Sequence, residues 1–195
     1  MWVGASALGL VVSAACHNDV TAPTIGVPRA SLLALARVDS VNPPARSTFL
    51  VKNNQLNSFQ IVHSDGSQTL FAQFNFPARS IVQANGLLVC DTCTTAVTVT
   101  ITNGLYSFTV APASLIFDIA GEPTVTVSYG VYGDLSVYSQ STKYATTEAY
   151  SDSLQLWREN TPDHWVRGRN SGHIGSFQIE SALETPGNYL IAAPK

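Results

Sequence analysis

The chain has 195 residues, of which 45% are hydrophobic and 12% charged, with ten Lys and Arg against thirteen Asp and Glu. A formal charge of −3 leaves no basic surface to neutralise a phosphate backbone, so we expect no nucleic-acid partner. The hydrophobic content excludes an intrinsically disordered chain, and the length predicts a single folded domain. The charged fraction is about half of the roughly 25% typical of soluble domains, a bias common among extracellular β-proteins.

Residues 1–15 form an uncharged, mostly apolar stretch, and the sequence becomes polar immediately after Cys16. The stretch is too short to span about 30 Å of hydrocarbon, but it has the length of the apolar region of a secretory signal peptide. We therefore predict that residues 1–15 are a signal peptide and that the protein is exported.

Small residues at Ser13, Ala14 and Ala15 precede Cys16 and resemble the lipobox of bacterial lipoproteins, in which the cysteine is lipid-modified and the chain is cut before it. The alternatives are an ordinary signal peptide cut after Ala14 or Ala15, or a buried N-terminal segment with a free Cys16. The resemblance implies a lipid anchor in the outer membrane or at the cell surface. Residues 16–30 show no sustained period and are predicted to form a lipidated, flexible tether.

Residues 31–195 contain many short runs in which apolar and polar side chains alternate. In 96–102 the apolar side chains of Val97, Val99 and Ile101 fall on one face, which is the pattern of a half-buried antiparallel strand. Further candidate strands are 68–74, 106–110, 124–129, 153–158, 164–167, 176–180 and 188–192. The segment 31–38 fits a short helix or a first strand, and we favour a strand. No segment reaches a helix of about 12 residues, so we predict an all-β, antiparallel β-sandwich over 31–195.

Two hairpins are predicted in detail. Asn103-Gly104 lies between two alternating runs and predicts a type I′ turn, because both central positions of that turn need a positive φ. The runs 154–158 and 164–167 predict a second hairpin over a loop of four or five residues. In that hairpin Trp157 and Trp165 would form an aromatic cross-strand contact.

The order of features from 68 to 192 resembles bacterial ZU5-like lipoprotein domains, a class of Ig-like β-sandwiches. The segments that carry the resemblance are Phe74–Val82, Tyr106–Phe117, Pro123–Tyr129, Leu154–Trp157, Phe177–Leu183 and Gly187–Ala192. Domains of this class are generally interaction modules without catalytic residues. The resemblance therefore implies binding or structural work and names no partner.

Cys90-Asp-Thr-Cys93 is the strongest local motif, and in an exported protein it predicts a short-loop disulfide. A redox-active pair normally lies at the start of a helix, whereas a β-run follows here. A zinc site would need two further ligands, and haem attachment would need His in place of Thr94. Free thiols remain the other alternative.

Three further groups of polar residues fit no known pattern of chemistry. His63, with Asp65 and Ser67 beside it, lacks the arrangement of a serine hydrolase. A set of Asp163, His164 and His173 matches no ligand spacing for a metal, and Asp134 with Asp152 matches no calcium loop. We therefore expect no catalytic residue, no metal site and no cofactor.

Aromatic side chains between 128 and 165 are the best candidates for a binding surface. Exposed aromatic rings on a β-face stack on sugars or dock proteins, because they supply a large rigid area at low entropic cost. The candidates are Tyr132, Tyr138, Tyr144, Trp157 and Trp165. The alternative is that these rings fill the core.

The leading hypothesis is a non-catalytic, lipid-anchored cell-envelope or surface protein that acts as an interaction module. Its partners would be the membrane, through the anchor, and an unidentified protein or glycan. One alternative is a structural subunit that self-assembles in the envelope by strand addition. A second alternative is a carbohydrate-binding accessory domain.

Overall fold

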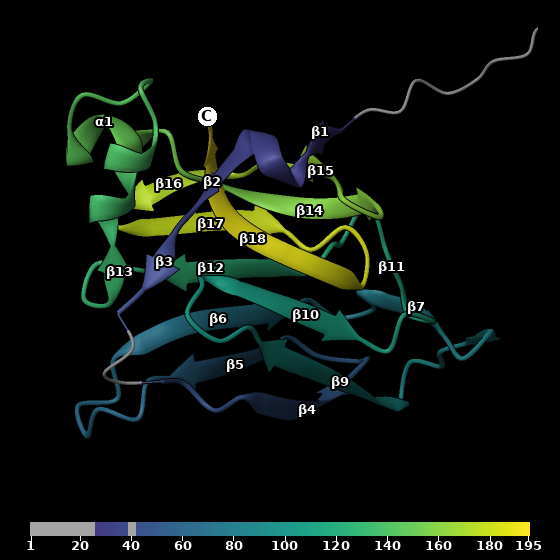
Figure 1. The fold of residues 1–195 in the computed structure, drawn as a ribbon. Coiled ribbons are helices and arrows are strands. Elements are labelled where there is room, and N and C mark those ends of the chain that lie inside the picture. The colour runs from purple at the N-terminus through teal and green to yellow at the C-terminus, as the bar shows by residue number, and fades with distance from the viewer. Residues whose placement is uncertain (1–25, 39–41) are drawn as a thin grey trace, which may run out of the picture.

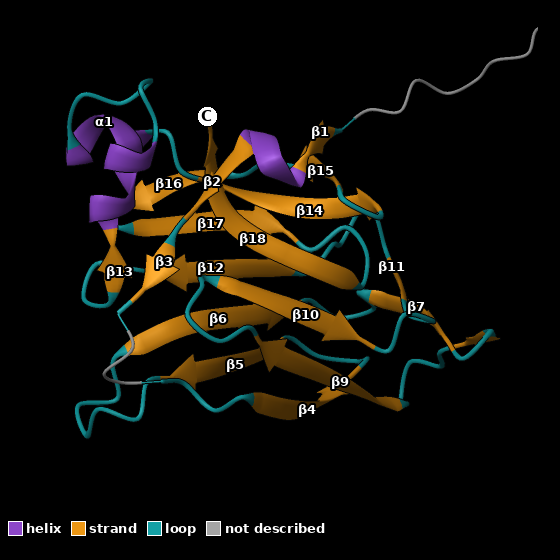
Figure 2. Cartoon of the chain, viewed as in Figure 1, coloured by secondary structure: helices purple, strands orange, loops and turns teal. Residues whose placement is uncertain are grey.

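The computed structural model describes residues 26–38 and 42–195. Within these residues the protein is an all-β sandwich in which the strand pairs are antiparallel, as predicted (Figures 1 and 2). The predicted signal peptide, Cys16 and the first part of the tether lie outside the described residues. No helix of the described part is long and apolar enough to span a membrane.

The larger layer, called here the large sheet, has eight strands among the described residues. Seven of them follow the order β1-β15-β14-β18-β10-β9-β4, and β2 pairs with β18 beyond the end of β10. Their bounds are β1 Val27–Pro28, β2 Leu32–Ala34, β4 Arg46–Lys52, β9 Thr94–Ile101, β10 Ser107–Ala111, β14 Gln155–Thr161, β15 His164–Arg167 and β18 Gly187–Pro194.

The second layer is a five-stranded sheet in the order β16-β17-β12-β6-β5. Its bounds are β5 Asn57–Val62, β6 Leu70–Phe76, β12 Thr124–Ser128, β16 Gly172–Gly175 and β17 Gln178–Ala182. The core lies between the two layers, where Phe74 of β6 meets Phe108 of β10 edge to face at 5.4 Å between ring centroids. The alternation predicted in β9 is confirmed, because Val97, Val99 and Ile101 are buried in this core.

Two small sheets and three short helical segments complete the fold. The three-stranded small sheet projects at one end of the sandwich, and a two-stranded sheet lies near the other end (Figure 1). The bounds of these elements are β7 Ile81–Ala84, β8 Leu87–Leu88, β11 Ile116–Phe117, β3 Ala36–Arg37, β13 Gly133–Asp134, α1 Thr147–Asp152, and the 3₁₀ segments η1 Arg29–Ser31 and η2 Leu135–Gln140.

The described N-terminal segment is part of the fold, which corrects the predicted tether of 16–30. Its first strand, β1, pairs with β15, and β2 pairs with β18. The segment covers the outer face of the large sheet, where Leu32, Trp157, Trp165, Leu190 and Ala192 form a second buried cluster. The folded domain therefore begins before residue 31, because Val27 pairs with Trp165 and packs against this cluster.

Two turns differ from prediction. The Asn103-Gly104 hairpin forms between β9 and β10, but Gly104 has a positive φ and Asn103 does not, so the type I′ prediction is wrong. The type I′ pattern occurs at Asn85-Gly86, which connects β7 to β8 with φ of 52° and 79°.

The predicted hairpin over 154–167 also forms, but β14 continues to Thr161 and leaves Pro162 and Asp163 as the turn. The loop is therefore shorter than predicted. Trp157 is paired with Arg167, and Trp165 with Glu159, so the two indoles are diagonal neighbours in the second cluster.

Candidate functional site

A pocket of about 450 Å³ opens at the end of the sandwich that carries α1 and the turn between β16 and β17. Figure 1 shows α1 beside β13 and β16, at the end opposite to β7 and β11. We call it the α1 pocket; its lining residues include Tyr129, Glu148, Ser151, Asp152, His173 and Phe177. It thus combines two aromatic rings, two carboxylates and an imidazole.

Tyr129 lies at the base of this site, directly after β12, and is 1% exposed. Its hydroxyl shares a hydrogen bond of 3.0 Å with the hydroxyl of Ser151, which is also buried. Burial raises the pKa of Tyr129, and the charge of Asp152 acts in the same direction. The phenol therefore stays neutral at physiological pH and ties α1 to the second sheet.

The carboxylates of Glu148 and Asp152 come from α1 and are one helical turn apart, so they lie on one face of the helix. The helix begins at Thr146, whose side-chain oxygen accepts a hydrogen bond of 3.2 Å from the backbone N–H of Ala149. The pKa of Glu148 is lowered by a hydrogen bond from its own backbone N–H and by the side chains of Thr146 and Thr147. Glu148 is therefore an anion throughout the neutral range.

Phe177 forms the rim of the pocket in a backbone conformation that a large side chain seldom adopts. Gly175 pairs with Gln178, so Ser176 and Phe177 alone make the turn, and Phe177 has a φ of 62°. Glycine or asparagine is usual at such a position, and the strain costs about 1 kcal/mol or more. Despite this, the ring is 45% exposed, with one edge-to-face contact of 5.8 Å between ring centroids to Tyr129.

The close approach of Phe177 also explains a glycine. A Cβ added at Gly130 would lie 2.9 Å from the Cβ of Phe177, which is closer than real side chains allow. The backbone N–H of Tyr129 donates a hydrogen bond of 3.0 Å to the carbonyl of Phe177. The strained turn is thus fastened to the end of β12 with the ring held at the mouth of the pocket.

The geometry of the α1 pocket suits binding of a cation better than nucleophilic chemistry. His173 meets Tyr129 ring to ring at 6.5 Å, and within the described part of the chain no hydrogen bond joins its imidazole to Ser151. Among the described residues no group of three or more His, Cys, Asp or Glu side chains converges for a metal. The site offers two carboxylates beside the exposed ring of Phe177, an arrangement that attracts an ammonium or guanidinium group.

The predicted surface residues are not gathered in one patch. Trp157 and Trp165 are buried in the second cluster, and the Trp157 indole N–H donates a hydrogen bond of 2.9 Å to the carbonyl of Ala192. Tyr144 is buried, and its hydroxyl donates to the carbonyl of Pro194 at 2.5 Å. In this structure these three rings serve the core, which was the alternative left open by the sequence.

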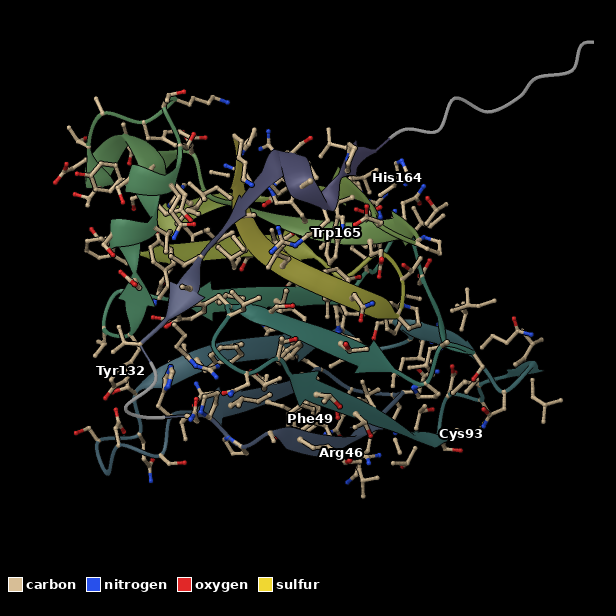
Figure 3. The ribbon with its side chains drawn as sticks, in the orientation of Figure 1. Arg46, Phe49, Cys93, Tyr132, His164 and Trp165 are labelled. Atoms are coloured by element: carbon tan, nitrogen blue, oxygen red, sulfur yellow. A yellow bond between two sulfur atoms is a disulfide. The ribbon has the colours of Figure 1, made fainter. Side chains whose placement is uncertain are left out.

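Tyr132 and Tyr138 are half-buried. Tyr132 donates a hydrogen bond of 3.0 Å to the carboxylate of Asp65 and contacts the ring of His63 at 4.4 Å between centroids. His63 itself is 2% exposed. Tyr138 packs against the main core. Figure 3 labels Tyr132 and Trp165 and places them well apart.

The remaining predicted residues lie in separate places. Cys90 and Cys93 form a disulfide, as predicted, between β8 and β9. The side-chain amide of Asn53 donates a hydrogen bond of 3.3 Å to the Cys90 carbonyl, so the bridge fastens the turn between β4 and β5. His164 lies in β15 of the large sheet and His173 in β16 of the second sheet, so the two strands are not neighbours in any sheet.

Comparison with known proteins found no matching family model, no matching curated protein and no matching solved structure.

Sequence reasoning missed Glu148 and Phe177 as site residues and considered Asp152 only for calcium. Glu148 and Asp152 have the four-residue spacing of one helix face, and Thr146 is a good N-cap residue. The sequence therefore contains a helix pattern here, but the pattern covers only the six residues of α1. Nothing in the sequence marks Phe177 as a turn residue, since the turn lacks the usual glycine.

Proposed function

We propose that the protein is a non-catalytic, lipid-anchored interaction module of the cell envelope, and that it binds a cationic group on an apolar stem in the α1 pocket. Lysine or arginine side chains of a partner protein have this chemistry. The observation that carries the proposal is the exposed ring of Phe177, held in a strained turn beside the carboxylates of Glu148 and Asp152. Strain of this kind persists where the surrounding structure enforces it, and often at binding sites.

The anchor half of the proposal rests on the sequence around Cys16, which lies outside the described residues. Mass spectrometry of the mature protein from membranes tests it directly. The expected result is an N-terminal cysteine carrying acyl chains, and an unmodified Cys16 at the mature N-terminus would remove the anchor.

The binding half is tested with three fluorinated fragments that share a ring and differ in charge. These are 4-fluorobenzylammonium, 4-fluorobenzyl alcohol and 4-fluorobenzoate, followed by ¹⁹F NMR line broadening with the chain from residue 16 carrying Cys16→Ser. Both hydrophobic clusters are built from residues 27 to 193, so this chain retains the whole described fold. We expect weak binding of the cation, weaker binding of the alcohol and none of the benzoate.

Two variants assign the binding to the α1 pocket. Glu148→Gln with Asp152→Asn removes both charges and should weaken ammonium binding about fivefold to tenfold while leaving the alcohol unchanged. Asp163→Asn is the matched control, because it removes one carboxylate from the turn at the other end of the sandwich. Equal effects of these two variants would exclude the pocket.

Phe177→Gly separates binding from structure. It relieves the positive φ, so the free energy of unfolding should stay within about 1 kcal/mol of the wild-type value, while affinity for all ring-bearing fragments falls. If instead methyl β-D-glucopyranoside displaces the ammonium fragment and binds more tightly, the pocket belongs to a carbohydrate-binding domain, the second alternative.

A further inference from the structure

The three-stranded small sheet, called here the small sheet, consists of β11, β7 and β8. It carries a group of exposed apolar side chains at the end of the sandwich opposite to the α1 pocket. Leu87 and Leu88 are 73% and 86% exposed, and they follow the tight turn at Asn85-Gly86. We call the group the apolar tip; it consists of Val82, Leu87, Leu88, Ile116 and Ile119, which are all exposed. Exposed apolar side chains gathered at one end of a protein often mark an interaction site.

The geometry of β8 explains why both leucines are uncovered. Successive side chains of a strand point to opposite faces, so Leu87 and Leu88 project from the two sides of the hairpin. Within the described residues β8 pairs only with β7, and it is the outer strand of the small sheet. The hairpin therefore presents apolar side chains on both of its faces. A surface that docks on a flat protein partner would present apolar side chains on one face only.

The β7–β8 hairpin of the apolar tip is free of charge, whereas Asp118 lies between Ile116 and Ile119 in the chain. No residue from 80 to 90 is charged, and the ion pair that flanks the hairpin, Arg79 with Asp91 at 2.8 Å, is neutral as a unit. Association through this tip would depend on burial of apolar area and hardly on salt. The formal charge of −3 on the whole chain does not favour an anionic surface either.

The first described residues lie at the same end of the molecule as the small sheet. Figure 1 shows β1 and β7 at this end, and Figure 3 labels His164, whose strand pairs with β1, and Cys93 there. Only residues 17–25 separate Cys16 from the first described residue, and nine residues reach at most about 30 Å. A lipid on Cys16 would hold this end of the sandwich close to the bilayer.

We propose that the apolar tip inserts into the surface of a phospholipid bilayer and orients the protein on the membrane. This inference rests on the proposed function for its anchor. The leucine side chains would enter the boundary between headgroups and acyl chains, about 5–10 Å deep. The hairpin backbone would stay at that level, because the outer edge of β8 has backbone groups that only water can satisfy and that hydrocarbon would leave unpaired.

The test uses the chain from residue 16 with Cys16→Ser, which cannot be acylated, and sedimentation with vesicles. One vesicle preparation is phosphatidylethanolamine with phosphatidylglycerol, and the other is phosphatidylcholine alone. We expect measurable partitioning into both that changes little between 50 and 500 mM NaCl. Leu87→Ser with Leu88→Ser should weaken it by at least about tenfold, since each buried leucine contributes about that factor.

Val131→Ser is the matched control, because Val131 is 65% exposed and lies between β12 and β13 at the other end of the sandwich. It should leave vesicle binding unchanged. All three substituted side chains are exposed, so the variants should fold normally, which circular dichroism checks.

Two results would overturn the inference. One is equal vesicle binding, or none, for the wild-type chain and the double variant. The other is a wild-type dimer in light scattering that the double variant does not form, together with no vesicle binding by either protein. The apolar tip would then be the interface between two copies of the chain. An unmodified Cys16 in mass spectrometry would defeat the anchor alone and would leave the vesicle measurement valid.

Discussion

Phe177 holds a left-handed backbone at the rim of the α1 pocket, where glycine would fit with less strain. The strained backbone places a ring that is 45% exposed against Gly130 and edge to face with Tyr129. We therefore attribute a strained and exposed side chain of this kind to binding of a partner, and not to stabilisation of the fold. The same reasoning singles out Leu87 and Leu88, whose side chains are 73% and 86% exposed.

Asp65 shows the opposite case, a residue whose environment stabilises its charge. The side chain of Thr69, with help from backbone N–H groups and from the Tyr132 hydroxyl, lowers the pKa of Asp65 from 3.8 to about 2. The folded state therefore binds the proton less tightly than the unfolded state does. The stability that Asp65 contributes is fully present above pH 3.8 and is lost as the pH falls from there toward 2.

We therefore expect Asp65→Asn to flatten the acid limb of the stability curve. The urea midpoint of the wild-type protein should fall more between pH 4 and pH 2 than that of the variant, and Tyr132→Phe should show an intermediate fall. Midpoints by circular dichroism across this range provide the measurement. Parallel curves for wild type and Asp65→Asn would show that the hydrogen bonds around Asp65 do not favour its charged form.

At the scale of elements, the N-terminal segment acts as a cover for the outer face of the large sheet. Leu32, 1% exposed, packs with Trp157 and Trp165 on that face. The segment is fixed at both ends by strand pairs, β1 with β15 and β2 with β18. Its removal would expose two indoles that the sandwich core does not bury.

Leu32→Ala should lower the free energy of unfolding by about 2–5 kcal/mol, the usual cost of a buried cavity. The chain from residue 16 contains only the tryptophans at 157 and 165, so native fluorescence reports this cluster alone. We expect a red shift together with the loss of stability. Leu50→Ala, at a side chain that is 64% exposed, should change stability by less than about 0.5 kcal/mol.

The elements that were predicted from sequence are those with a clear alternation. β9 and β10 bury every second side chain over 97–101 and 107–111, and the apolar residues of β12 also recur with the period of a strand, although Thr126 between them is buried too. β4 exposes Leu50 and β8 exposes two leucines, so their patterns indicate no buried face. α1 has six residues and lies below the length at which a helix pattern becomes distinct, which also hid Glu148 and Asp152.

At the scale of the whole molecule, two functions are assigned to opposite ends. Figure 1 shows β1 and β7 toward one end of the sandwich and α1 at the other. The apolar tip therefore lies at the first end, and the α1 pocket opens at the second. A protein held by both an anchor and the tip would present the pocket away from the lipid. Binding in the pocket and binding to the membrane should then be independent.

We expect the acylated protein in nanodiscs to bind 4-fluorobenzylammonium with the same dissociation constant as the soluble chain. Ligand-observed ¹⁹F NMR measures both forms under the same conditions. A loss of fragment binding on the nanodisc would mean that the membrane covers the pocket and that the proposed orientation is wrong.

The position of β18 has a consequence for how the protein is made. This last strand lies between β14 and β10 in the large sheet and also pairs with β2 from the described N-terminal segment. Pairings between strands so distant in sequence form slowly. The large sheet also lacks its central strand until β18 has been synthesised. We therefore expect the large sheet to stay incomplete until β18 is available, since β14 and β10 meet only through this strand.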